Sequence, residues 1–443
     1  MRYRCESCGY SSPKWMGFCP GCGNPAALVE APPVRGRSAP PRATRVVPLT
    51  AVGTEDAARR LIGIAEVDRV LGGGLVAGAT LLVGGEPGVG KSTLLLQVAG
   101  SIAAGGGTAL VASAEESAAQ IALRARRLGL AHPGVLLAAE SDVDAIVAAA
   151  NAARPDLLVV DSIQTVAAAE VGGTPGGVAQ VREAAARLVH FSKESGVPVV
   201  LVGHVTKDGS IAGPRLLEHA VDVVLYLEGD IERGLRVLRS LKNRFGATHQ
   251  VGLFEMGDAG MQAVPDPSGW LVAGWNGRVP GSVVFPSVDG RRPLLVEVQA
   301  LVSPKESASP RRSVRGLEAA RVHQVLAVLE RHAHFDLSAR DVYVSVVGGL
   351  QVRDPGADLP VAVALVSSFL DRPLGAIAAW GEVGLTGEVR AVAYGERRAA
   401  EAARLGVETA VGPAGNGEDR IERALVRAGL PPAPRPVRAL RPG

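Results

Sequence analysis

The sequence predicts an α/β protein with a small metal-binding ribbon at its N-terminus, a nucleotide-binding core on a mostly parallel sheet, and a C-terminal α+β domain. Three observations support this order: four cysteines in two close pairs, a glycine-rich loop between an apolar strand and a helix, and strands alternating with helices along most of the remaining chain. The expected domains are the ribbon at 1–30, a basic Pro-rich linker at 31–50, the nucleotide-binding core at 51–275 and the C-terminal domain at 276–443.

Composition limits the functional classes. The formal net charge is only +3 over 443 residues, so any nucleic-acid site must come from local patches. The most apolar run, Pro360 to Leu370, is shorter than the roughly 20 residues that span a bilayer, and the N-terminus lacks the apolar segment of a signal peptide. We therefore expect a cytoplasmic protein without membrane association. Lysine is rare beside arginine, so a retained lysine indicates a site that requires a compact ammonium group.

The four cysteines have the spacing C-x2-C-x10-C-x2-C. Two such pairs bring four thiolates to one tetrahedral Zn²⁺, and a fragment this small needs the metal to fold. Disulfides are the alternative, disfavoured in the cytoplasm. A closed four-thiolate site leaves no open position for catalysis, so the zinc is expected to be structural. Its ligands are Cys5, Cys8, Cys19 and Cys22.

Between the cysteine pairs lie Lys14, Trp15 and Phe18. The favoured interpretation is that the two aromatic side chains cover the zinc site; the alternative is that Lys14 and Trp15 contact DNA or another domain. The linker that follows, 31–48, is expected to be a plain tether rather than a DNA-binding arm.

The nucleotide-binding core shows four helical segments and five short apolar runs, the pattern of a parallel sheet covered on both faces. The expected strands are Ala79–Gly84, Thr108–Ser113, Leu157–Asp161, Val197–Gly203 and Val221–Leu227. The expected helices are Lys91–Ala104, Glu116–Leu128, Val143–Ala153 and Val178–Ser195.

The loop after the first strand matches G-x-x-x-x-G-K-S, the phosphate-binding P-loop. Its backbone N–H groups would surround the phosphates of ATP or ADP, Lys91 would reach the β- and γ-phosphates, and the Ser92 hydroxyl would bind Mg²⁺. The residues expected to contact the nucleotide here are Gly85, Glu86, Pro87, Gly88, Val89, Gly90, Lys91, Ser92 and Thr93.

Carboxylates end two later strands. Asp161 closes an apolar run in the Walker B pattern and would hold Mg²⁺ through water. Glu115 follows the strand after the P-loop helix, at the edge where such sheets bind ligands, and is the candidate base that polarises water. Glu116 is the alternative, although an acid in the first turn of the next helix explains it as well.

At this point the sequence resembles the bacterial RadA (Sms) family of recombination proteins. The cysteine ribbon, the segment Ile62–Leu75 and the P-loop follow in that family's order, and Lys242-Asn-Arg-Phe-Gly246 reproduces its KNRFG motif. The segment Gly203–Gly209 resembles its sensor and DNA-loop region. The resemblance implies a hexameric ring of RecA-like ATPase cores that binds single-stranded and branched DNA, hydrolyses ATP to drive branch migration, and works with a RecA-type recombinase.

The resemblance extends to individual residues. Lys242 and Arg244 are two apart in a strand-like run, Arg236–Phe245, and therefore share one face. An exposed basic edge strand would explain them too; in a ring they would reach DNA or the nucleotide of a neighbouring subunit. His204 is a candidate γ-phosphate sensor, with a structural histidine equally favoured, and Lys207 is a candidate DNA-phosphate contact.

Residues from about 276 resemble the proteolytic domain of Lon, a Ser/Lys peptidase with a fold like that of ribosomal protein S5. Gly356 stands at the serine position and Glu396 near the lysine position, and no lysine follows Lys305. A peptidase is therefore not expected; the domain is expected to be a scaffold or a DNA surface.

Further expectations concern single segments of this domain. Ser303–Gly316 is expected to be a loop, and Ser367 and Ser368 are expected to lie in the core. A histidine metal site is disfavoured for His323, His332 and His334. The basic side chains could contact DNA or face solvent: Arg311, Arg312, Arg315 and Arg321.

Three functional classes remain: a DNA-stimulated ATPase motor, which is favoured; an ATP-dependent protease, disfavoured by the missing lysine; and a nucleotide-switched binding module. The zinc ribbon and the KNRFG motif discriminate against the last, because a switch needs neither.

Overall fold

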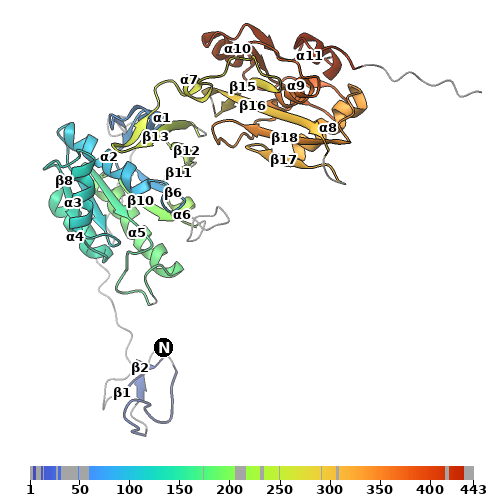
Figure 1. Cartoon of the computed structure of the whole chain (residues 1–443). Helices are drawn as coiled ribbons and strands as arrows, with labels where there is room; N and C mark the ends of the chain where they lie inside the picture. The colour runs from blue at the N-terminus through green and yellow to red at the C-terminus, as the bar shows by residue number, and fades with distance from the viewer. Residues whose placement is uncertain are drawn as a thin grey trace, which may run out of the picture. The chain divides into compact units, whose positions relative to one another are not determined.

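The computed structural model (Figure 1) describes residues 3–5, 11–12, 14–25, 28–30, 48, 59–172, 174–204, 216–229, 234–248, 250–290, 292–305, 309–414 and 419–433. The chain divides into two compact units, Met1–Asp56 and Ala57–Gly443. Among the described residues, none of the helices has the length and apolar character needed to cross a membrane. The expected linker, apart from Pro48, and the last ten residues lie outside the described part of the chain.

The first unit is a three-stranded antiparallel sheet. Its strands lie in the order β2-β1-β3, with β1 in the centre, and Cys5 ends β1. A turn holds the second cysteine pair: the N–H of Gly23 donates to the carbonyl of Cys19 at 2.7 Å, and Gly23 has the left-handed φ of +70° that glycine adopts without strain. The strands are β1 (Tyr3–Cys5), β2 (Ser11–Ser12) and β3 (Leu28–Glu30).

The second unit begins with the ATPase core, a nine-stranded sheet in the order β14-β13-β12-β11-β6-β10-β9-β7-β8. Strands β6 to β11 all run parallel to one another in the sheet. Beyond β11 the sheet continues with the antiparallel strands β12, β13 and β14. The predicted mostly parallel sheet is confirmed. The strands are β6 (Thr80–Gly85), β7 (Ala109–Ser113), β8 (Val135–Ala138), β9 (Leu157–Asp161), β10 (Val199–His204), β11 (Val223–Gly229), β12 (Leu235–Asn243), β13 (Val251–Gly257) and β14 (Gly260–Ala263).

Helices cover both faces of this sheet because alternate residues of its buried strands point to opposite sides. Leu81 and Val83 of β6 pack with α1 and α2, whereas Leu82 lies in the cluster formed by α4 and α5. A Ser117–Gln120 capping box starts α3. The helices are α1 (Ala65–Leu71), α2 (Lys91–Ala104), α3 (Ala118–Arg127), α4 (Val143–Ala153), α5 (Val178–Ser195) and α6 (Leu216–Ala220); a short sheet pairs β4 (Arg59–Arg60) with β5 (Leu75–Val76).

The C-terminal part is an α+β arrangement on a six-stranded sheet in the order β17-β18-β16-β15-β19-β22. The apolar helix α9 packs on β15 and β16, and almost every residue of α9 is buried. The strands are β15 (Ser282–Asp289), β16 (Arg292–Pro304), β17 (Arg312–Arg315), β18 (Arg340–Val346), β19 (Ile377–Ala379) and β22 (Thr409–Val411), with a hairpin of β20 (Glu382–Val383) and β21 (Val389–Arg390). The helices are α7 (Pro267–Leu271), α8 (Ala319–His332), α9 (Asp358–Phe369), α10 (Gly395–Arg404) and α11 (Ile421–Arg427).

Two sequence predictions about strands are wrong. The segment Ser303–Gly316 is not one loop, because β16 continues to Pro304 and β17 forms at Arg312–Arg315, where it pairs parallel with β18 at the sheet edge. An edge strand exposes alternate side chains, so its polar composition does not prevent pairing. The run Arg236–Phe245 is a strand only as far as Asn243, and Arg244 lies in the turn that follows.

Candidate functional sites

The P-loop connects β6 to α2 at the carboxyl edge of the parallel sheet. The Lys91 ammonium group is buried beneath the loop and donates to the carbonyls of Gly85 and Glu86 at 2.8 and 2.9 Å. Burial lowers the pKa of Lys91, while the nearby carboxylates of Asp161 and Glu115 act in the opposite direction. This geometry closes the loop around the ammonium group and places it beside two acids.

Glycine is required at the end of the loop. Gly90 has a φ of +111°, and a Cβ built there would lie 2.4 Å from the terminal carbon of Met261 and 2.6 Å from that of Met256. Any larger residue would be strained in its backbone and would displace the terminal methyl groups of these two methionines.

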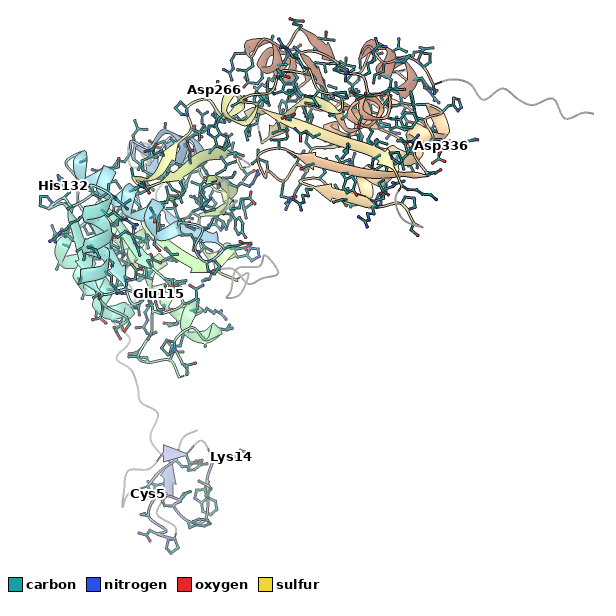
Figure 2. All side chains as sticks on the ribbon, in the orientation of Figure 1. Cys5, Lys14, Glu115, His132, Asp266 and Asp336 are labelled. Carbon is teal, nitrogen blue, oxygen red and sulfur yellow. The ribbon has the colours of Figure 1, made fainter. Side chains whose placement is uncertain are left out.

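Asp161 and Glu115 meet at the same edge. Ser113 and Asp161 are register partners on β7 and β9, and the Ser162 hydroxyl, directly after Asp161, donates to the Glu115 carboxylate. Glu115, labelled in Figure 2, is exposed, whereas Ser162 is fully buried. The hydrogen bond therefore holds an exposed carboxylate next to the end of the Walker B strand.

The alternative acid, Glu116, is engaged elsewhere. Its carboxylate pairs with Arg124 of α3, and its N–H donates to the Ser113 hydroxyl at 3.3 Å. Because Glu116 is paired with Arg124, the geometry favours Glu115 over Glu116 as the candidate base that polarises water.

The donor set fits a magnesium ion. Ser92 and Asp161 line one small cavity, so a hydroxyl and a carboxylate lie close together there, whereas Glu116 of the same cavity is paired with Arg124. Mg²⁺ prefers oxygen ligands and is held in such sites by one or two protein groups together with substrate phosphates.

The KNRFG segment lies towards the amino ends of the parallel strands, at the end of the sheet opposite the P-loop. Lys242 of β12 is level with Leu82 through Val224, and its ammonium group turns to the end of α6, donating to the carbonyls of Glu218 and Val221 at 2.7 Å each. Burial, followed by the charge of Arg244, lowers the pKa of Lys242, and two nearby carboxylates act against this. Since β12 lies between β11 and β13, it is not the exposed basic edge strand that would have explained these residues.

Arg244 reaches the same region from the turn after β12. Its N–H donates to the Asp222 carbonyl at 3.1 Å, and its guanidinium lies 3.4 Å from the Asp222 carboxylate, while the Arg244 side chain as a whole is 57% exposed. Asn243 shapes the turn: its side chain donates to the Leu71 carbonyl and accepts the Phe245 N–H. Lys242 and Arg244 thus converge on one region, although Arg244 does so from outside the strand.

Two further predicted residues lie at the edge of the described structure. The backbone of His204 ends β10 as the register partner of Gly85, beside the P-loop. Lys207 lies outside the described residues, as does Cys8.

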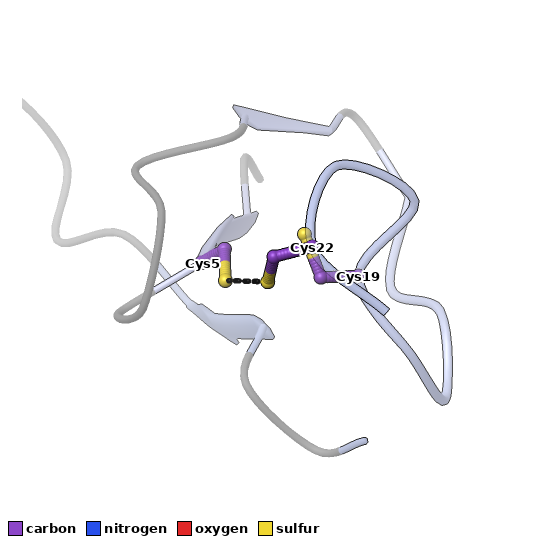
Figure 3. A group of neighbouring side chains, drawn as sticks. All are labelled: Cys5, Cys19 and Cys22. Atoms are coloured by element: carbon purple, nitrogen blue, oxygen red, sulfur yellow. Dashed lines mark hydrogen bonds between the residues drawn. The ribbon is translucent and has the colours of Figure 1, made fainter. Parts of the chain in front are cut away.

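The three described cysteines form a candidate metal centre (Figure 3). Their sulfur atoms lie within 4.8 Å of one another, and the Sγ atoms of Cys5 and Cys22 are 3.7 Å apart. None of the three forms a disulfide, and tetrahedral Zn²⁺ with bonds of about 2.3 Å separates its sulfurs by about 3.8 Å. The donor set therefore fits zinc, with Cys5, Cys19 and Cys22 as ligands and the Cys8 position completing the spacing.

Known protein families match both the nucleotide-binding core and the cysteine ribbon. Residues 43–210 match the family described as AAA domain, and residues 3–30 match the family described as rubredoxin metal binding domain. The chain is 44% identical to the DNA repair protein RadA of Bacillus subtilis over 94% of this chain and 93% of that protein. The proteins of the same name from Mycolicibacterium smegmatis (46% identity, 94% and 91% coverage) and Brucella abortus (44%, 97% and 96%) are equally similar.

The chain belongs to the RadA family of DNA repair proteins. The resemblance seen in the sequence is confirmed, and so is the assignment of an ATPase domain behind a zinc ribbon.

One expectation for the ribbon of this RadA-family chain is wrong. Trp15 and Phe18 were expected to cover the zinc site, yet each is 59% exposed. Tyr3 and Met16 pack on the buried sulfurs of Cys5 and Cys19 instead. The two exposed aromatic side chains are therefore available for contact outside the ribbon.

The C-terminal domain of the RadA-family chain contains a buried ion pair beside Gly356. Arg398 pairs with Asp354 at 2.7 Å, donates to the Pro286 carbonyl at 2.6 Å and is almost fully buried. A Cβ on Gly356 would lie 3.3 Å from a nitrogen of Arg398. Arg398 therefore joins Asp354 to β15 through a buried ion pair and a hydrogen bond.

The other expectations for this domain can be compared with its contacts. Ser367 is buried and its hydroxyl bonds within the core, as predicted, whereas Ser368 is only partly buried. Arg321 is paired with Asp358 rather than presented to solvent alone. In the described part of the chain, the histidines do not form a metal-binding group.

Sequence reasoning missed three residues at these sites. Ser162 orients Glu115, and Asp222 receives Arg244. Arg236, buried in β12, donates to the P-loop carbonyl of Val89 at 2.8 Å. The only signal for Arg236 was an arginine within the apolar run Leu235–Leu238, and a charged residue in such a run needs a buried partner.

Proposed function

We propose that this chain is a DNA-stimulated ATPase motor, which works as a ring oligomer and uses ATP hydrolysis to drive branch migration on single-stranded and branched DNA. Its relatives are named as DNA repair proteins. The P-loop, the two carboxylates beside Lys91 and the basic pair of the KNRFG segment supply the parts that such a motor requires.

The observation that carries the proposal is the position of Lys242 and Arg244. The turn with Arg244 is level with Thr80, whereas the P-loop follows Gly85 at the other end of β6. At roughly 3.3 Å per residue the two edges are on the order of 15 Å apart. The pair therefore faces away from the nucleotide of its own subunit, and its targets are a neighbouring subunit's nucleotide or DNA.

At the carboxyl edge each residue has a separate role. Lys91 would exchange its carbonyl partners for the β- and γ-phosphates, and the Gly88–Gly90 backbone would donate to them. Glu115, held by Ser162, would orient the attacking water. Ser92 and Asp161 would hold Mg²⁺, which neutralises charge developing on the phosphates. His204 at the end of β10 is proposed as a sensor of the γ-phosphate.

A hexameric ring would place Lys242 and Arg244 of one subunit against the next, and Lys207 would contact DNA phosphates. Zinc would hold the ribbon folded. A RecA-type recombinase is the proposed protein partner, and a cytoplasmic location fits a DNA substrate. The Lon-like domain is proposed as a scaffold or DNA surface.

The test is ATP hydrolysis by the zinc-loaded protein with and without single-stranded DNA. Wild type should be stimulated by DNA, Lys91→Ala should lose hydrolysis, and Lys242→Ala and Arg244→Ala should lose the stimulation with zinc content unchanged. Hydrolysis that depends on Lys91 but is indifferent to DNA would contradict the motor and support the nucleotide-switched module. If both basic-pair variants behave as wild type, the role given to the KNRFG segment is wrong.

A further inference from the structure

Asp222 lies at the meeting point of four chain segments. It precedes β11, is only 4% exposed, and has a carboxylate surrounded by donors. One oxygen, Oδ2, accepts from the N–H and the hydroxyl of Thr80 at 3.0 Å each, and from the Lys193 ammonium group at 2.6 Å. Three bonds to one oxygen fix the carboxylate on β6 and on the end of α5.

The other oxygen faces the KNRFG segment. Oδ1 of Asp222 lies 3.4 Å from the Arg244 guanidinium, and the backbone carbonyl of Asp222 accepts the Arg244 N–H. Lys242 binds the carbonyl of Val221, one residue before Asp222. Both basic residues of the motif are therefore held at this one point of the chain.

The hydrogen bonds to Asp222 also change the pKa of its carboxyl group. Burial alone would raise the pKa of Asp222, but the hydrogen bonds from Lys193 and Thr80 outweigh it, and the pKa is lowered. The carboxylate is thus charged at neutral pH and presents a fixed negative charge to an arginine whose side chain is more than half exposed.

We propose that Asp222, fixed by Thr80 and Lys193, is a positioning residue that presents Arg244 and Lys242 to a target outside their own subunit. A half-exposed arginine samples many rotamers unless a partner limits them, and misplacement of a charged group by about 1 Å can reduce a rate on the order of 100-fold. The inference rests on the proposed role of the KNRFG segment and adds the residue that orients it.

The first experiment compares steady-state kinetics of Asp222→Asn with wild type in the presence of single-stranded DNA. Asparagine keeps the shape and one acceptor oxygen but removes the charge. The expected result is a kcat lowered on the order of 10- to 100-fold with an unchanged KM for ATP, because the basic pair would act on charge that develops in the transition state and not on the binding of ATP. Lys193→Met should give a smaller fall in kcat, and Lys193→Arg should restore it.

A matched control comes from the C-terminal domain. Asp419 is equally buried and pairs with Arg427 at 2.8 Å, far along the chain from the P-loop and the KNRFG segment. Asp419→Asn should leave kcat at the wild-type value. A fall of equal size in both variants, or a higher KM for ATP in Asp222→Asn, would mean that Asp222 only supports the fold, and the inference would fail.

Mixed oligomers separate this inference from the proposed function. In a ring, a site combines the P-loop of one subunit with the basic pair of the next. Mixing Lys91→Ala with Lys242→Ala should therefore give more activity than either alone, and mixing Lys91→Ala with Asp222→Asn should do the same. Rescue in the first mixture but not in the second would overturn the role of Asp222 alone, whereas rescue in neither would overturn action on a neighbour's nucleotide.

Discussion

The two edges of the ATPase sheet use buried charge in different ways. At the carboxyl edge, Lys91 is held by two backbone carbonyls and stands beside two carboxylates. At the opposite edge, Asp222 is enclosed by side-chain and backbone donors of its own chain. A bound phosphate can replace the two carbonyls that hold Lys91, so this lysine can change its contacts. The carboxylate of Asp222 already accepts hydrogen bonds from its own chain, so it can only hold its neighbours in place. The first edge is built for exchange with a ligand and the second for positioning.

The largest expected effect tests the exchange edge directly. Glu115→Gln should lower the kcat for ATP about 10²- to 10⁴-fold with little change in nucleotide affinity, because an amide cannot accept the proton of the attacking water. Glu116→Gln is the matched control, since Glu116 is paired with Arg124, and should retain most activity. Fluorescent-nucleotide binding and single-turnover hydrolysis measure the two quantities. The reverse pattern would move the base to Glu116.

Arg236 connects the two edges, since β12 carries it near the P-loop and carries Lys242 at its other end. Arg236→Met keeps the length of the side chain but removes the bond to Val89 and leaves that buried carbonyl without its guanidinium. A lost hydrogen bond to a charged group costs about 1.5–3 kcal/mol, so the affinity for ATP should fall on the order of 10- to 100-fold. Titration of nucleotide measures this. An unchanged affinity for ATP would show that the P-loop keeps its shape without the hydrogen bond from Arg236.

The exchange edge was largely predictable from sequence, and the positioning edge was not. The P-loop residues are contiguous, and Asp161 ends a strand whose apolar run marks its direction, so strand and helix bounds such as Leu157–Asp161 and Lys91–Ala104 were confirmed without change. Asp222 depends on Thr80 and Lys193, which are 142 and 29 residues away along the chain. No local spacing records such a contact.

The exposed Trp15 illustrates the same limit at the ribbon. An aromatic residue between two cysteine pairs is expected to be buried because its side chain is apolar. Whether it is buried in a small ribbon depends on the turns around it, which the sequence pattern does not specify. The end of β12 at Asn243 is a related case, because the side chain of Asn243 accepts the Phe245 N–H and closes the turn there. Periodicity alone continues the strand to Phe245.

The smallest expected effect concerns the acid stability of the positioning edge. Because the pKa of Asp222 is lower in the folded protein than its usual value near 3.9, its ionised form stabilises the fold above that value, and this contribution is lost as the pH falls through the lower folded pKa. Wild type should therefore unfold at a higher temperature than Asp222→Asn at pH 7, by an amount that corresponds to about 1–3 kcal/mol. The difference should shrink as the pH is lowered below about 4, and calorimetry at a series of pH values measures it. The groups that face the carboxylate are Lys193, Arg244 and Thr80; side chains of these types do not titrate in this acid range, so the change would come from Asp222 itself. A difference that stayed constant with pH would mean that packing, rather than the fixed charge, is what Asp222 contributes, and the contrast between the two edges would then lose its electrostatic basis.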